Sequence, residues 1–131
     1  MDRMNHYLAF VELLAGWRQE CLQFASELAE AALVASVETG IDLRHYETGL
    51  TIEMFVDVEL ATGNAITFWV DIGPRFDSPW AVHSFVRRMA GAEQVGVIEI
   101  EDCSAKIVED VDKAVRRSLK AFRQIDPSVA F

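Results

Sequence analysis

The amino-acid sequence predicts an α+β fold in which two helices cover one face of a four-stranded antiparallel sheet, as a single domain over residues 1–131. Three observations predict this class. A heptad of apolar residues near the N-terminus indicates a long helix, strict alternation of apolar and polar residues in the middle indicates a hairpin, and an apolar stripe near the C-terminus indicates a second helix. With 51% hydrophobic residues, the chain can bury a core without disulfides or metal ions.

The first helix is expected over residues 3–38. Its apolar side chains recur at alternating steps of four and three; they are Phe10, Leu14, Trp17, Cys21, Phe24, Leu28, Ala31 and Ala35. A straight helix of this length would span on the order of 54 Å, whereas a compact domain of this size has a radius of gyration of about 14 Å. Because its N-terminal turns would extend beyond the domain, we expect Phe10, Leu14 and Trp17 to form a homodimer contact.

The middle of the chain predicts a β-hairpin. Gly40 is expected to stop the first helix, and residues 41–49 to form a connecting loop. Residues 51–60 and 65–72 alternate apolar and polar side chains, as half-buried strands do. A three-residue loop at 62–64 would pair Leu60 with Ile66 and Val58 with Phe68, because only an odd loop keeps apolar residues opposite apolar residues.

Residues 79–90 fit two structures. The alternation of Trp80, Val82, Ser84 and Val86 favours a strand, which would pair with a fourth strand over residues 95–101. The spacing of Val82, Phe85, Val86 and Met89 fits a helix instead, which would give the alternative order α-β-β-α-β-α. We expect the strand, and hence a four-stranded meander.

The last helix is expected to begin with Ser104 as its cap and to end before Pro127. Its apolar stripe comprises Ile107, Val111, Ala114 or Val115, Leu119 and Phe122. Asp112 and Arg116 are spaced to form an ion pair on its exposed side. Both helices are expected to cover the sheet face that carries Val56, Val58, Phe68 and Val70.

The composition and the absence of known motifs argue against several kinds of ligand. The net charge is −9, and residues 1–77, with 13 acids and 4 bases, account for all of it, which argues against a nucleic-acid ligand. No phosphate-binding loop, nucleophile elbow, metal-ligand spacing or paired CxxC occurs, so no cofactor or metal is expected. Cys21 and Cys103 are expected to be reduced, and the absence of a long apolar run or signal peptide predicts a cytoplasmic protein without a membrane contact.

The sheet face turned away from the helices is the expected binding surface. It combines aromatic and acidic side chains; the residues expected to contact a partner are Glu53, Phe55, Asp57, Glu59, Trp69, Asp71, His83 and Phe85, with Thr67 between them. Aromatic residues provide apolar anchors and carboxylates attract positive charge, so this face predicts a basic protein partner.

Three functions are therefore considered. The first is a non-catalytic, bacterial-type binding protein that occupies a basic protein, in the manner of an immunity protein. The second is a secretion chaperone, because the size, acidity and terminal helices of the chain look like those of small dimeric secretion chaperones. The third is a small-ligand-binding or hydrolytic enzyme that uses His83, Asp71 or Glu99 in a pocket between sheet and helices.

Overall fold

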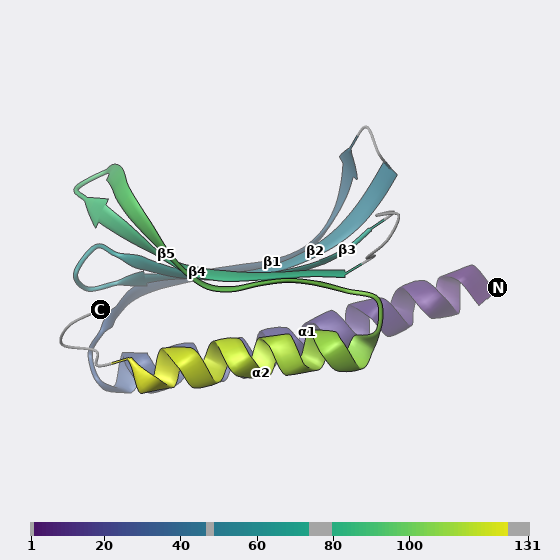
Figure 1. Ribbon diagram of the computed structural model, residues 1–131, viewed down its shortest axis with the longest axis horizontal. Helices are drawn as coiled ribbons and strands as arrows, with labels where there is room; N and C mark the ends of the chain where they lie inside the picture. Colours follow the sequence, from purple (N-terminus) through teal and green to yellow (C-terminus); the bar gives the residue numbers. More distant parts are fainter. Residues whose placement is uncertain (1, 47–48, 74–79, 126–131) are drawn as a thin grey trace.

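The computed structural model describes residues 2–46, 49–73 and 80–125. It shows two layers: a five-stranded antiparallel sheet, and two helices that cover one of its faces (Figure 1). The elements are α1 (Asp2–Glu30), β1 (Val34–Tyr46), β2 (Gly49–Leu60), β3 (Ala65–Ile72), β4 (Trp80–Ala90), β5 (Glu93–Ala105) and α2 (Val108–Gln124), and the strands lie side by side in chain order. The α+β class is confirmed, with five strands where four are expected.

The first helix ends eight residues before the expected Glu38. Leu33 N donates to Leu28 O at 3.0 Å and Ala32 N donates to Ala29 O at 3.0 Å, which is the hydrogen-bond pattern of a Schellman cap. Ala32 adopts a φ of 60°, in the left-handed region where such a cap usually has glycine. The helix end therefore lacks the glycine that normally marks it in a sequence, and Gly40 lies inside β1 instead.

Residues 34–46 form β1, so the expectation of a helix up to residue 38 and a loop over 41–49 is wrong. Val37, Thr39, Ile41 and Leu43 alternate with Glu38, Gly40, Asp42 and Arg44. β1 pairs with β2 along its whole length, with Gly40 opposite Phe55 and Glu38 opposite Asp57. The strand adds an edge to the sheet and brings charged residues beside β2.

The hairpin of β2 and β3 is confirmed, but its register differs by two residues from the expected one. Val58 pairs with Ile66 and Val56 with Phe68. Leu60 N donates to Asn64 O at 2.8 Å, so the loop has three residues, 61–63, and Gly63 takes a φ of 95° within it. Because the loop length is odd, the apolar face remains as expected even though the partners have changed.

Residues 80–90 form a strand, which confirms the first of the two alternatives. Trp80, Val82, Ser84 and Val86 point toward the helices and are buried. β5 is longer than the expected 95–101 and includes Ser104, which therefore does not cap α2. α2 begins after Ile107 without a side-chain cap, and Pro127 lies outside the described residues.

The core lies between the sheet and the helices. Val56, Val58, Phe68 and Val70 are buried there, as expected, together with Val111, Ala114, Val115, Leu119 and Phe122 from α2. The rings of Phe24, Phe68 and Phe122 pack on one another with centroids 5.0–6.2 Å apart. This aromatic cluster joins α1, β3 and α2.

Phe10, Leu14 and Trp17 pack within the chain rather than pointing away from it. The rings of Phe10 and Trp17 make edge contacts with Trp80, at centroid distances of 5.8 and 5.6 Å. Leu14 is fully buried in the same core. The structure thus places in the interior the side chains that are expected to form a dimer contact.

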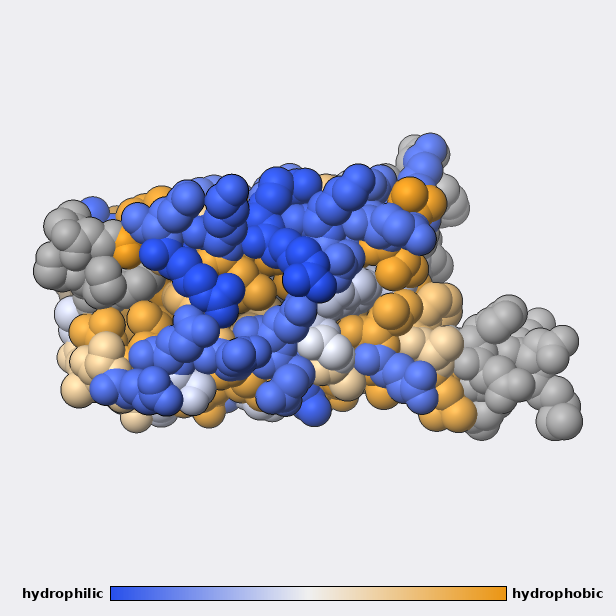
Figure 2. Space-filling view, turned by 90° about the horizontal axis from the view of Figure 1, so that it is seen from below, coloured by the Kyte–Doolittle hydropathy of each residue, from blue (hydrophilic) through white to orange (hydrophobic). Residues whose placement is uncertain are grey.

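The helices run in the same direction beneath the sheet (Figure 1) and are joined by polar contacts. Trp17 Nε1 donates to Asp112 at 3.1 Å, Arg116 lies 3.3 Å from Glu20, and Arg123 lies 3.1 Å from Glu27. A hydrogen bond from Arg116 is the main cause that lowers the pKa of Asp112. Figure 2 shows this side of the molecule, with a more hydrophilic surface over α2 than over α1.

Replacing Gly16 with alanine is expected to raise the free energy of unfolding by about 0.5–1 kcal/mol, because alanine fixes a helical backbone at a smaller entropic cost than glycine. A Cβ atom at Gly16 would meet no heavy atom within 4 Å. Urea denaturation followed by circular dichroism measures the change. Gly63→Ala is the matched control: space is equally open there, but φ is 95°, so the same substitution should destabilise. A loss of stability in Gly16→Ala would contradict the open space that the structure shows at this position.

Candidate functional site

The candidate site is the face of the sheet turned away from the helices, which we call the open face. Two neighbouring cross-strand rows define its centre. The first row is Gly40, Phe55, Trp69, His83 and Asp102, and the second is Glu38, Asp57, Thr67, Phe85 and Glu99. In Figure 1 the β4–β5 hairpin and the opposite ends of β1 and β2 rise away from the helices, so this face is concave.

Aromatic side chains form the middle of the open face. Phe55 lies over Gly40, where a Cβ atom would come within 3.0 Å of the ring, so the glycine makes room for the aromatic side chain. Trp69 lies between Phe55 and His83 across the strands and remains 37% exposed. The ring of Phe85 packs against His83 with centroids 4.8 Å apart. An apolar platform is therefore accessible in the centre of a polar surface.

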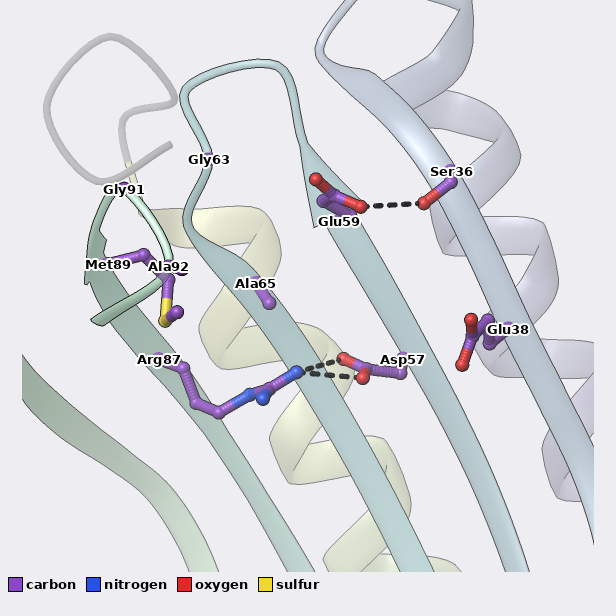
Figure 3. Close-up of a pocket in the computed structure, with 10 residues that line it drawn as sticks. All are labelled: Ser36, Glu38, Asp57, Glu59, Gly63, Ala65, Arg87, Met89, Gly91 and Ala92. Atoms are coloured by element: carbon purple, nitrogen blue, oxygen red, sulfur yellow. Dashed lines mark hydrogen bonds and ion pairs between the residues drawn. The ribbon is translucent and has the colours of Figure 1, made fainter. Parts of the chain in front are cut away.

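Charged side chains surround this platform, and several form ion pairs. The Arg87 side chain crosses β3 next to Ala65 to reach Asp57 on β2 (Figure 3), and its Nη2 donates to the two carboxylate oxygens at 2.7 and 3.0 Å. Thr67 Oγ1 also donates to Asp57, at 3.0 Å. These bonds hold the Asp57 carboxylate in one orientation.

A second ion pair lies nearer the end of β1. Arg44 Nε is 2.8 Å from Glu53, whose carboxylate is otherwise enclosed, since Glu53 is only 5% exposed. A buried carboxylate requires such compensation. His83 Nε2 lies 2.9 Å from Glu99 on the other side of the platform.

Two hollows adjoin each other on the open face. A hollow of about 390 Å³ is lined by Arg44, Glu53, Phe55, Asp57, Thr67, Trp69, Phe85 and Arg87. The second, of about 300 Å³, is lined by Ser36, Glu38, Asp57, Glu59, Gly63, Ala65, Arg87, Met89, Gly91 and Ala92 (Figure 3). Asp57 and Arg87 line both hollows, so this ion pair stands between an aromatic hollow and an acidic one.

The open face carries most of the net charge of the chain. Eight carboxylates and two guanidinium groups lie on the described part of this face, which gives it a net charge of −6 with histidine neutral; they are Glu38, Asp42, Glu53, Asp57, Glu59, Asp71, Glu99 and Asp102 against Arg44 and Arg87. The whole chain carries −9. Two thirds of the net charge thus lies on one face of one layer.

All eight residues expected to contact a partner lie on the open face, but they differ in accessibility. Glu59 and Trp69 are exposed, and Phe55, Asp57, His83 and Phe85 are partly exposed. Glu53 and Asp71 are buried between their neighbours and have little surface to offer. They support the face rather than form its contact surface.

The open face also contains charged residues that the sequence does not predict to lie there. Glu38, Asp42 and Arg44 lie on β1, which was expected to be helix and loop. Their alternation with Val37, Ile41 and Leu43 is the signal that could have revealed the strand. The role of Arg87 is not predicted either, because its ion-pair partner, Asp57, lies on β2 and β3 separates the two strands.

The residues considered for an enzyme are brought together only in part. His83 and Glu99 form a hydrogen bond, but neither lines the two hollows. Asp71 lies in another row, opposite Glu53 and Ala81. In the part of the chain that the structure describes, no three His, Cys, Asp or Glu side chains group closely enough to hold a metal ion.

The two cysteines and the two helices remain to be placed. Both cysteines are free; Cys21 is buried in the core, where burial raises the pKa of its thiol to about 12, and Cys103 is half-buried on β5. Neither described helix has the length and hydrophobicity that crossing a membrane requires.

Comparison of the chain with protein-family models, with curated proteins and with solved structures finds no match.

Proposed function

We propose that the open face binds a basic protein and that the chain acts by occupying that protein, in the manner of an immunity protein bound to a toxin domain. The observation that carries this proposal is the net charge of −6 on one concave face of a chain whose total is −9. Such a field accelerates the encounter with a positively charged surface and orients it.

The exposed aromatic residues would contribute binding energy in addition to the electrostatic attraction of the carboxylates. Binding energy at protein interfaces is concentrated in a few aromatic and arginine side chains that become fully desolvated. Trp69 offers such an anchor because it is exposed at the centre of the face, beside the hollow that Phe55 and Phe85 also line. The surrounding carboxylates would form the polar rim.

The test is an affinity capture from the native cell extract at low and at raised salt, with variants that change the charge of one face only. The open-face variant combines Glu59→Gln, Glu99→Gln and Asp102→Asn. The control combines Glu12→Gln, Glu30→Gln and Glu109→Gln on the helix side. All six side chains are exposed, and both variants have the same net charge.

The wild type and the control are expected to retain the same basic protein at low salt and to release it as salt screens the charges. The open-face variant should retain much less of it. If both variants lose the protein equally, net charge and not the open face causes retention. If the wild type retains no basic protein at either salt concentration, the proposed function is wrong.

Trp69→Ala is expected to weaken binding of the captured protein at least tenfold, or about 1.4 kcal/mol, while lowering the free energy of unfolding by no more than about 2 kcal/mol, because the partly covered ring loses contacts with its strand neighbours. The reason is that Trp69 is exposed on the open face, outside the core between sheet and helices. Isothermal titration calorimetry with the purified partner gives the affinity, and thermal denaturation gives the stability. Leu8→Ala, an exposed apolar truncation on α1, is the control and should change neither quantity. Unfolding of the Trp69 variant would place this side chain in the core and remove it from the interface.

A further inference from the structure

The outer edge of β1 is open to another strand. β1 borders only β2 among the described strands, and its residues 36–46 pair with β2 without any register shift. It contains no proline, no lysine and no bulge within that run, which are the devices that commonly block pairing at an edge. Residues 35–39 are exposed along it.

The other edge of the sheet is protected. β5 has two register shifts against β4, near Phe85 and near Met89, and bulges of this kind twist an edge away from a straight partner. Its charged side chains are all acidic: Glu93, Glu99, Glu101 and Asp102. Glu99 and Glu101 are paired with His83 and Arg117, so it is mainly the bulges that disfavour a straight partner at β5, and β1 is the edge suited to pairing.

We infer that two copies of this chain associate through β1, antiparallel about a two-fold axis at Ile41, to form one continuous ten-stranded sheet. Around this axis, residues equally distant from Ile41 face each other. Glu38 then lies opposite Arg44 of the second copy, and the symmetry repeats this opposite-charge pair. Glu38 and Arg44 are both exposed on the open face, and Arg44, whose Nε lies 2.8 Å from Glu53 of its own chain, would bridge that carboxylate and Glu38 of the second copy.

The charged side chains favour the register with its axis at Ile41 over the register with its axis at Gly40. An axis at Gly40 would place Glu38 opposite Asp42, which sets like charges against each other twice. With the axis at Ile41, Asp42 lies opposite the uncharged Gly40, so no like charges face each other there. Charge complementarity therefore favours the axis at Ile41.

The opposite side of β1 contributes apolar surface to the same contact. Leu43, which is 51% exposed in the single chain, lies opposite Thr39 of the second copy, and Ile41 lies opposite its own counterpart. Pairing would remove these side chains from water and satisfy the backbone groups along the edge. The inference does not depend on the proposed partner, because its contacts belong to the strand edge.

The experiment is sedimentation velocity and light scattering on the purified full chain at about 0.15 M salt, where the Debye length is about 8 Å. The wild type should have twice the chain mass of 14.7 kDa. Glu38→Arg, which places arginine opposite Arg44, should raise the dissociation constant of the dimer at least tenfold. The combined swap Glu38→Arg with Arg44→Glu should restore the dimer, because the opposite charges are exchanged.

Because Arg44 also pairs with the buried Glu53, the swap could fail to fold, and a second variant keeps the inference testable. Leu43→Lys changes an exposed side chain and should give a folded monomer, whereas the matched Val97→Lys on the β5 edge should remain a dimer. A wild type that stays monomeric at millimolar concentration overturns the inference. So does a dimer that Val97→Lys disrupts and Leu43→Lys does not.

Discussion

Replacing Phe122 with alanine is expected to lower the free energy of unfolding by about 3–5 kcal/mol, the usual cost of truncating a buried phenylalanine. Phe122 is fully buried, and its ring packs on Phe24 at 5.9 Å and on Phe68 at 5.0 Å between centroids. The truncation would leave a cavity where α1, α2 and the sheet meet. Urea denaturation followed by circular dichroism measures the loss.

Phe85→Ala is the matched control, because it deletes the same atoms from the opposite face of the sheet. Phe85 is only partly buried on the open face, so its truncation should cost less than half as much. Similar losses for the two variants would contradict the assignment of one sheet face to the core and the other to solvent. The comparison therefore tests the two-layer fold without a binding partner.

The parts of the fold that the sequence predicts well are those in which one face is buried and the other is not. The alternation of Val56 and Val58 with Asp57 and Glu59 has a period of two, which only a strand produces. The same pattern predicts which side chains share the open face, and this holds although the register is displaced by two residues. A displacement of two changes the partners but leaves every side chain on its own face.

The end of the first helix could not be predicted for a physical reason. Residues 31–35 are all apolar, and a short apolar run fits a helix as well as a strand. The usual signal for the boundary is a glycine at the left-handed position, and here Ala32 adopts that conformation. Without that signal the heptad pattern extends into β1, and a strand of the binding face is missed.

The sequence predicts which side chains share the open face, but it does not predict their accessibility or their ion pairs. Alternation places Glu53 and Trp69 on the same face, yet it cannot tell that Glu53 is enclosed by its neighbours while Trp69 is exposed. Arg44, which reaches Glu53 from β1, contributes to that difference. Contacts between strands that are distant in sequence, such as Arg87 with Asp57, have no local signature.

The two proposed surfaces are centred on different parts of the sheet and meet at Glu38 and Arg44 of β1, which line the hollows and also face each other across the dimer axis. The partner surface is centred on β2, β3 and β4, and the dimer surface is the outer edge of β1. Pairing of two chains through β1 would place two open faces side by side and double the acidic surface. A basic partner with two equivalent sites, or two copies of it, would then bind more tightly than one site alone allows.

Replacing Leu14 with glutamate is expected to unfold the chain at neutral pH. Leu14 is 0% exposed beneath the sheet, and an unpaired carboxylate there would lose its hydration without gaining a charged partner. The expected loss exceeds about 4 kcal/mol, a large part of the total stability of a domain of this size. Far-ultraviolet circular dichroism and solubility of the purified variant measure the result.

The control is Leu8→Glu, the same change six residues earlier on α1, where the side chain is 52% exposed. This variant should fold and melt like the wild type. The pair also decides which surface forms the dimer. If α1 mediated association through Leu14, the Leu14 variant would be a folded monomer; if Leu14 belongs to the core, the chain unfolds, and only changes on β1 separate intact subunits. A folded, monomeric Leu14→Glu variant would therefore refute both the internal packing of α1 and the edge pairing through β1.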